Sequence, residues 1–267
     1  MLAIPLALQL YSVKDEAAAD LADVIAQAGD WGFDGVEFAG YHGHSASQVR
    51  TMLDAAGLQC AGAHVPIDQL EGEAVGATAE FHLAIGCPYL IVPWLPGDRR
   101  DSVEACKRTA DLFNEIARSL VPHGLRAGFH CHAIDCKPLP DAPDKTPWSL
   151  LGELTGEAFI MQYDTANGLE GSGDAVAPVL ANPGRGVSTH LKEYKVGATD
   201  DPETGHGQAV IGEGSVPWAD VFAACEKPVD QGGAGTRWYV VEQEGHPTLN
   251  PMNAAKRGLD NLRAMGK

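Results

Sequence analysis

The sequence predicts a single-domain α/β protein, a (β/α)₈ barrel that spans residues 1–267. Eight short apolar runs alternate with eight longer amphipathic segments, and 267 residues is close to the roughly 250 that such a barrel typically needs. The alternative is an open, doubly wound sheet. No Gly-x-Gly-x-x-Gly turn follows the first apolar run. This absence, together with the count of eight, favours the barrel.

The apolar runs predict parallel strands at 6–11, 35–38, 59–65, 89–93, 125–132, 158–163, 186–191 and 238–241. The segments between them predict helices at 20–31, 45–56, 70–85, 102–120, 148–154, 174–180, 216–225 and 253–265. In the first helix Leu21, Val24, Ile25 and Ala28 recur at intervals of three or four residues, which places them on one face. The stretches 136–147 and 193–214 are long connections from strand to helix, and in a barrel these lie on the catalytic face.

Composition narrows the classes of partner and compartment. The chain carries 36 acidic and 19 basic residues, a net charge of −17, which argues against nucleic acid and against anionic membrane surfaces. The six cysteines form no Cys-x-x-Cys pair, which is typical of free thiols in a reducing compartment. No run reaches the roughly 20 apolar residues that span a bilayer, and no signal peptide is recognisable. We therefore expect a cytoplasmic protein.

Polar side chains recur where the predicted strands end, and in a barrel these ends converge on one mouth. They are Glu37, His64, His132 with Asp135, Asp164, His190 and Glu242. Taken singly, each has a structural explanation: Asp164 as a turn cap, His190 as a hydrogen-bonded core histidine, Glu37 as a surface ion-pair partner. Their joint placement is what indicates a site. Asp135, Asp164, His190 and Glu242 offer three carboxylates and one imidazole, a set suited to one divalent ion: Mn²⁺, Mg²⁺, Co²⁺ or Zn²⁺.

The stretch from Gly128 to Asp135 contains two imidazoles and a carboxylate within six residues. In a regular strand His130 and His132 share a face and Cys131 points away from both. Asp135 then has to lie past a bend to reach the same mouth. Thiolate ligation by Cys131 or Cys136 is a minor alternative.

These residues stand in motifs that resemble a known family. In chain order the motifs are Gln9-Leu10-Tyr11-Ser12, Gly35-Val36-Glu37-Phe38-Ala39-Gly40, Ala63-His64-Val65-Pro66, His130-Cys131-His132-Ala133-Ile134-Asp135, Asp164-Thr165-Ala166-Asn167, His190-Leu191-Lys192-Glu193, Gly212-Glu213-Gly214 with Trp218, and Val241-Glu242-Gln243. Their order and strand positions are similar to those of the xylose isomerase-like TIM barrels, the sugar phosphate isomerase/epimerase group. The resemblance covers nearly the whole chain.

The resemblance implies roles for individual residues. The central motif of the family usually reads His-Asn-His-x-x-Glu-Phe, which makes Asp135 a metal ligand beside Asp164, His190 and Glu242. It also makes His132, Glu242 and Lys192 the catalytic residues, and Glu37, His64 and Gln9 the substrate-binding ones. Two departures matter: Cys131 replaces Asn, and Asp135 replaces Glu. Asp is one methylene shorter than Glu, so His130 is an alternative fourth ligand.

The implied activity is that of a metal-dependent isomerase or epimerase that removes a proton next to the carbonyl of a sugar, keto-sugar or related polyol. A lyase or dehydratase on a keto-sugar or keto-polyol is the main alternative. Less favoured are a metal-dependent phosphodiesterase, which the acidic charge opposes, and a sugar-binding barrel without catalysis. The expected partner is a small sugar-like molecule, with neither nucleic acid nor membrane; a homo-oligomer is left open.

Overall fold

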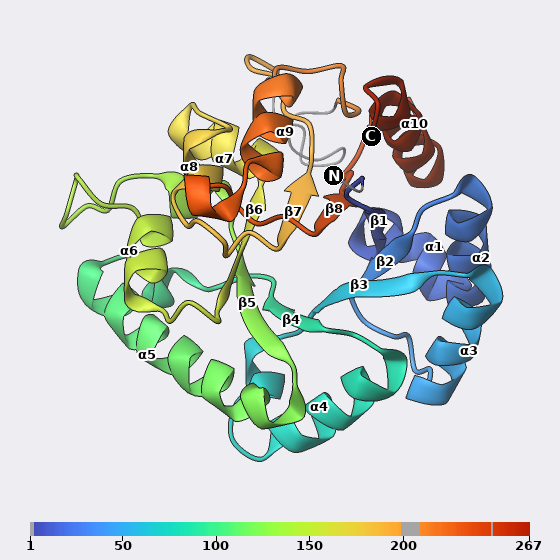
Figure 1. Cartoon of the computed structure of the whole chain (residues 1–267), viewed down its shortest axis with the longest axis horizontal. Coiled ribbons are helices and arrows are strands. Elements are labelled where there is room, and N and C mark those ends of the chain that lie inside the picture. Colours follow the sequence, from blue (N-terminus) through green and yellow to red (C-terminus); the bar gives the residue numbers. More distant parts are fainter. Residues whose placement is uncertain (1–2, 199–208, 247) are drawn as a thin grey trace.

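The eight predicted strands form a closed parallel barrel in chain order (Figure 1). They are β1 (Leu6–Gln9), β2 (Gly35–Phe38), β3 (Gln59–His64), β4 (Tyr89–Val92), β5 (Arg126–His130), β6 (Ile160–Asp164), β7 (Ser188–Leu191) and β8 (Trp238–Val241). β8 pairs with β1 to close the barrel, with Leu6 in register with Tyr239. The prediction of a single-domain (β/α)₈ barrel is confirmed.

The structure is a computed structural model that describes residues 3–198, 209–246 and 248–267. The predicted loop at 193–214 is therefore described only at its two ends, and residues 199–208 lie outside the described part.

Helices form a ring around the barrel (Figure 1). They are α1 (Lys14–Ala19), α2 (Leu21–Trp31), α3 (Ala46–Ala56), α4 (Ala74–Ile85), α5 (Val103–Leu120), α6 (Pro147–Leu154), α7 (Thr165–Ser172), α8 (Ala177–Leu180), α9 (Trp218–Glu226) and α10 (Pro251–Ala264). Short 3₁₀ turns are η1 (Leu10–Val13), η2 (Ile67–Leu70), η3 (Gly97–Arg99), η4 (Val121–His123), η5 (Ala133–Cys136) and η6 (Val229–Gln231). Within the described ranges, every helix is too short or too polar to cross a bilayer.

The inner face of the barrel changes from apolar to polar along the strands. Residues two apart in a strand share a face, so Ile160 lies on the same inner face as Gln162 and Asp164. Ile160 and Val240 belong to a buried apolar cluster, whereas Gln162 and Asp164 are buried polar residues. The polar layer therefore lies at the carboxyl ends of the strands, above an apolar floor.

Two local differences from the prediction shape the site. β5 ends at His130, two residues earlier than predicted, because the chain turns into η5 directly after His132. α7 begins at Thr165, immediately after β6, where no helix was predicted. Asp164 is both the last residue of β6 and the N-cap of α7.

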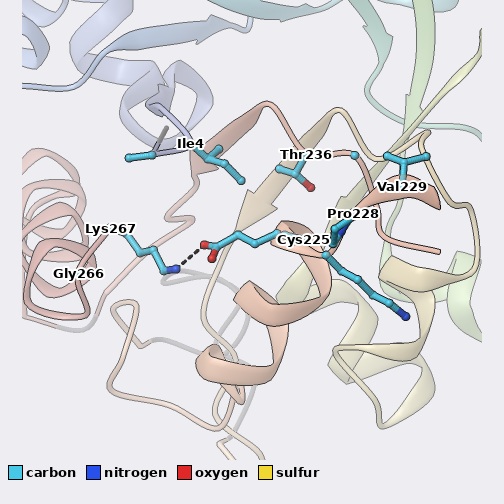
Figure 2. A pocket seen from close by; sticks show the side chains of 11 residues that line it. Ile4, Cys225, Pro228, Val229, Thr236, Gly266 and Lys267 are labelled. Carbon is cyan, nitrogen blue, oxygen red and sulfur yellow. Dashed lines mark hydrogen bonds and ion pairs between the residues drawn. The ribbon is translucent and has the colours of Figure 1, made fainter. Parts of the chain in front are cut away.

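A cavity of about 470 Å³ lies at the opposite end of the barrel (Figure 2). Its lining includes Ile4, before β1, and Thr236, before β8, together with Cys225 and Lys267. In the described part of the chain, the groups of side chains arranged to hold a cation lie elsewhere, at the carboxyl ends of the strands. This cavity is therefore separate from the candidate active site.

Candidate active site

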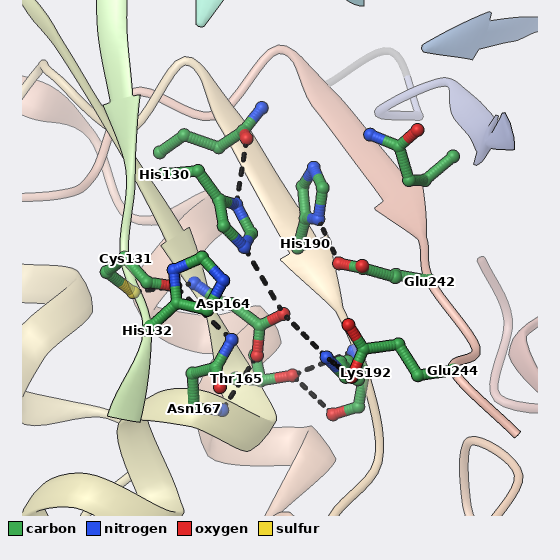
Figure 3. A network of polar contacts seen from close by, with 12 residues as sticks. His130, Cys131, His132, Asp164, Thr165, Asn167, His190, Lys192, Glu242 and Glu244 are labelled. Carbon is green, nitrogen blue, oxygen red and sulfur yellow. Dashed lines mark hydrogen bonds and ion pairs between the residues drawn. The ribbon is translucent and has the colours of Figure 1, made fainter. Parts of the chain in front are cut away.

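Four neighbouring strands bring together a compact group of ligand-type side chains. His130 ends β5, Asp164 ends β6, His190 lies in β7, and Glu242 directly follows β8. One nitrogen or oxygen of each lies within 4.8 Å of the corresponding atom of the other three, and all four residues are buried. We call these four residues the strand-end cluster. Figure 3 shows their side chains converging from separate strands.

Asp164 presents an unsatisfied oxygen to this cluster. Its Oδ1 accepts a hydrogen bond from the backbone N–H of Asn167 at 2.7 Å, which caps α7. Its Oδ2 is buried without a hydrogen-bond partner, 3.9 Å from His130 Nε2 and 4.0 Å from Lys192 Nζ. Burial raises the pKa of Asp164 to about 7, although the nearby Lys192 ammonium lowers it. A buried carboxylate oxygen without a donor is costly, and a bound cation would remove that cost.

Gln162 determines which nitrogen of His130 faces the cluster. The Gln162 amide nitrogen donates to Glu37 Oε1 at 2.7 Å and to Ser188 Oγ at 2.9 Å, so its oxygen must act as an acceptor. That oxygen accepts hydrogen bonds from His64 Nε2 and His130 Nδ1, each at 2.9 Å. His130 therefore carries its proton on Nδ1, and the lone pair of Nε2 points toward Asp164.

His190 lies between two carboxylates. Its Nε2 is 2.6 Å from Glu37 Oε2, and its Nδ1 is 2.6 Å from Glu242 Oε2. Burial opposes a charge on this ring, but Glu37 and Glu242 outweigh burial and raise the pKa of His190 to about 10. Burial likewise raises the pKa of both carboxyl groups, yet their cationic neighbours outweigh it: His190 and His64 hold that of Glu37 below its usual value, and Lys192 and His190 hold that of Glu242 well below. In the absence of a cation, His190 is an imidazolium held by two carboxylates.

Two residues predicted to bind substrate lie beneath the cluster. Gln9 and Glu37 are fully buried. Gln9 Nε2 donates to Glu37 Oε2 at 2.7 Å, and Gln9 Oε1 accepts from the backbone N–H of Tyr11 at 3.0 Å. In this position Gln9 holds Glu37, and Glu37 holds His190. His64, the third predicted substrate-binding residue, is half-buried beside them and bonded to Gln162.

Asp135 does not join the strand-end cluster, and His130 stands where Asp135 was expected. Arg100 Nη1 lies 3.0 Å from both carboxylate oxygens of Asp135. Asp135 Oδ2 also accepts the backbone N–H of His132 at 2.7 Å. Burial raises the pKa of Asp135 to about 6, although Arg100 lowers it. The Asp135 side chain stabilises the turn after β5. His130, the alternative ligand, takes the fourth position in the strand-end cluster.

His132 and Lys192 lie beside the cluster with opposite electrostatic character. His132 Nδ1 is buried without a hydrogen-bond partner. Burial first, and then the charge of Lys192, lower the pKa of His132 to about 3, so its imidazole is neutral at pH 7. Burial opposes the charge of Lys192, but Glu242, Glu244 and Asp164 outweigh burial and raise its pKa. Lys192 Nζ is 2.7 Å from Glu244 Oε2 (Figure 3).

Several residues that hold the side chains of the site in place were not predicted from the sequence. Gln162 and Glu244 each lie two residues from a predicted ligand, Asp164 and Glu242. The period of two along a strand was the available signal for Gln162. Arg100 carried no such signal, because it follows η3 in a loop and its partner Asp135 lies 35 residues away.

Comparison with known proteins identifies the family of the chain. The family profile described as xylose isomerase-like TIM barrel matches residues 25–265. No curated protein sequence matches the chain significantly.

Solved structures with the same fold include three enzymes. One is a sugar phosphate isomerase/epimerase from Parabacteroides distasonis, with a TM-score of 0.77 and 20% identity, covering 98% of this chain and 94% of that one. Another is a D-allulose 3-epimerase from a Methylomonas species, with a TM-score of 0.66 and 16% identity, covering 98% and 97%. The third is the probable 3-DHS dehydratase from Bacillus anthracis, with a TM-score of 0.69 and 15% identity, covering 97% and 98%. At these identities the likeness establishes the fold.

Proposed function

Since this chain belongs to the xylose isomerase-like TIM barrel family, we propose that it is a divalent-metal-dependent isomerase or epimerase acting on a sugar, keto-sugar or related polyol. The reaction begins with removal of a proton next to the carbonyl group. The observation that carries the proposal is the buried, unpartnered Oδ2 of Asp164, which faces His130 and Lys192. The solved sugar phosphate isomerase/epimerase and the D-allulose epimerase that share the fold support the same reaction class.

The residues of the strand-end cluster fit a divalent ion. They supply two carboxylates and two imidazoles, all ligand types that divalent ions accept. Asp164 Oδ2 has no hydrogen-bond partner, and His130 Nε2 lies 3.9 Å from it. The bound ion would act as a Lewis acid that polarises the substrate carbonyl and makes the adjacent C–H more acidic.

His132 is the first candidate for the proton-accepting group, with Glu242 as the second. The His132 imidazole is neutral, and its buried Nδ1 is free to accept. Burial and Lys192 keep its pKa near 3, below the range in which a general base works best, so its candidacy rests on the unpartnered nitrogen. Glu242 is ionised but already bonded to His190.

Lys192 supplies a fixed positive charge. Its ammonium lies 4.0 Å from Asp164 Oδ2, and three carboxylates keep it charged. In this role it stabilises negative charge that develops on a substrate oxygen during proton removal.

Lys192 also bears on the dehydratase alternative. Loss of a hydroxyl from the substrate needs an acid that donates a proton to the leaving oxygen. The raised pKa of Lys192 makes it a poor donor, so dehydration would need another acid, such as protonated His132. Dehydration stays the alternative reaction, and a probable dehydratase shares the fold.

The proposal is tested by deuterium exchange. Protein loaded with a divalent ion is incubated with D-fructose, D-tagatose and D-allulose in deuterated water, and label is followed by NMR and mass spectrometry. We expect label at the carbon next to the carbonyl. Asp164→Asn and His132→Gln are expected to reduce exchange at least 100-fold, because the first removes a carboxylate ligand of the ion and the second removes the first candidate base.

The matched control is Asp54→Asn, which changes an exposed carboxylate in α3 and should leave exchange unchanged. Metal-loaded protein that labels none of the sugars would contradict the proposal. Release of a dehydrated product would instead favour the lyase alternative.

A further inference from the structure

The strand-end cluster contains two nitrogen ligands where the sequence predicted one. With His130 in place of Asp135, the set is two imidazoles and two carboxylates. As ligands of an ion, the predicted set of three carboxylates and one imidazole would carry a charge of −3. The observed set would carry −2, once the ion has displaced the proton of the His190 imidazolium. This difference bears on which ion the site selects.

The surrounding residues hold both imidazoles in fixed orientations at the cluster. Gln162 Oε1 occupies the Nδ1–H of His130 and leaves Nε2 free. Glu37 Oε2 lies 2.6 Å from Nε2 of His190, and Glu242 Oε2 lies 2.6 Å from its Nδ1, so an ion bound at Nδ1 would replace the proton shared with Glu242. A carboxylate or amide oxygen behind a ligating imidazole fixes its tautomer and orientation.

A second possible cation site, which overlaps the strand-end cluster, consists of imidazoles alone. His64, His130 and His190 form a second, overlapping group whose ligand atoms lie within 4.8 Å of one another. The rings of His64 and His190 are stacked, with centroids 5.3 Å apart. In the described ranges, each group arranged to hold a cation therefore contains at least two imidazoles.

A positive charge lies beside the two carboxylates. Lys192 Nζ is 4.0 Å from Asp164 Oδ2 and partly neutralises it. Mg²⁺ relies on hard oxygen ligands and six-coordinate geometry, and Mn²⁺ has the lowest affinity in the series of first-row divalent ions. Both depend more on carboxylate charge than Zn²⁺ does, since Zn²⁺ gains more from imidazole nitrogen.

We propose that the strand-end cluster is a zinc-class site that selects Zn²⁺, with Co²⁺ as its closest substitute, over Mn²⁺ and Mg²⁺, and that His130 sets this selection. The inference rests on the metal site of the proposed function. It adds the class of ion and the residue that determines it.

The test compares metal affinities and needs no substrate. Full-length protein is stripped with a chelator, and dissociation constants for Zn²⁺ and Mn²⁺ are measured by chelator competition and calorimetry. We expect wild type to bind Zn²⁺ at least 1000-fold more tightly than Mn²⁺. His130→Glu is expected to narrow this ratio at least tenfold, mainly by weakening Zn²⁺, and to change the visible spectrum of bound Co²⁺.

Two glutamine variants provide the matched comparison. His130→Gln removes the proposed ligand and should weaken Zn²⁺ more than Mn²⁺. His132→Gln removes the neighbouring imidazole and should leave the ratio within twofold of wild type. If His130→Glu does not fold, this pair of variants decides the question.

Two results would contradict the proposed preference for Zn²⁺. One is a wild-type ratio of Zn²⁺ to Mn²⁺ affinity below 1000-fold, and the other is a ratio that His130→Gln and His130→Glu leave unchanged. If metal-dependent deuterium exchange persists in that case, the proposed function survives without it. Wild type that binds neither ion overturns both.

Discussion

Buried histidines in this protein are of two kinds, and their hydrogen bonds separate them. His82 is satisfied on both nitrogens: Nδ1 donates to the Thr78 carbonyl at 2.6 Å, and Nε2 accepts from Tyr41 Oη at 2.8 Å. His132, by contrast, has a buried Nδ1 without a partner, and His130 Nε2 lies 3.9 Å from Asp164 Oδ2. The bonding of the nitrogens, rather than burial itself, therefore separates His82 from the histidines of the barrel mouth, where His190 is held between two carboxylates.

The satisfied histidine gives a prediction for pH. Burial lowers the pKa of His82 below its ordinary 6.5. As the pH falls below about 6.5, the unfolded chain takes up a proton that the folded protein does not, so stability is lost in this window. His82→Asn should cost about 1 kcal/mol at pH 7, because the Tyr41 hydroxyl loses its acceptor.

In urea denaturation, the gap between wild type and His82→Asn should shrink from pH 7 to pH 5. Only wild type carries the protonation penalty at position 82. A gap that widens on acidification would contradict this assignment.

At the residue scale, the structure departs from the prediction at Asp135, whose side chain makes hydrogen bonds that the sequence pattern does not indicate. The position of Asp135 in the motif predicted a ligand, but its nearest donors are the His132 backbone and Arg100. His130 was only an alternative, yet alternation along β5 places it on the inner face. The hydrogen-bond competition that decides between them depends on the loop carrying Arg100, which the sequence pattern does not position.

At the scale of elements, α7 ties the helix ring to the site. Asp164 caps this helix through Oδ1 while Oδ2 faces the cluster, so the start of α7 determines how the carboxylate is oriented. Gly168 lies one turn into the helix, above the Tyr163 ring. A Cβ at Gly168 would lie 1.6 Å from Tyr163 Oη. The glycine allows α7 to begin directly after β6.

Gly168→Ala should therefore destabilise the protein by roughly 3 kcal/mol, because Tyr163 or α7 has to move. The displacement should also weaken metal binding through Asp164. Gly76→Ala in α4 is the matched control: a Cβ there meets nothing within 4 Å, and it should stabilise by up to about 1 kcal/mol. Urea denaturation midpoints test both, and equal midpoints for the two variants would contradict the packing argument.

The elements that could be predicted from the sequence were those whose apolar residues repeat with the period of a helix or form a short apolar run. All eight strands were predicted, and so were the long helices such as α2, α3 and α5. α1 and α7 were missed because they are short and adjoin other elements without a turn signal between them. Short helices of this kind depend on capping and tertiary packing more than on periodicity.

At the scale of the molecule, the closed barrel was predictable because eight alternating units of this length have few other arrangements. The convergence of the strand ends followed from that topology, and it brought Asp164, His190 and Glu242 together as predicted. The net charge of −17 supports the proposal that the partner is a small molecule rather than a nucleic acid.

The placement of the cluster predicts that a bound ion stabilises the whole barrel. Its four residues come from β5, β6, β7 and the end of β8, which are consecutive in the sheet. At 100 times its dissociation constant, an ion that binds only the folded state adds about 2.7 kcal/mol. For a chain of this size that corresponds to a rise in Tm of roughly 5–10 °C. Calorimetry of chelator-stripped protein with and without Zn²⁺ measures it.

The Asp164→Asn control distinguishes an ion bound in the strand-end cluster from ions attracted to the acidic protein without a specific site. A protein with a net charge of −17 attracts divalent ions without a specific site, but salt at 0.15 M screens exposed charges over about 8 Å. The scan is therefore run at that ionic strength with Asp164→Asn in parallel. The shift should vanish in Asp164→Asn and reverse on adding a chelator to wild type. A shift of equal size in both proteins would mean that the ion binds the surface and not the strand-end cluster.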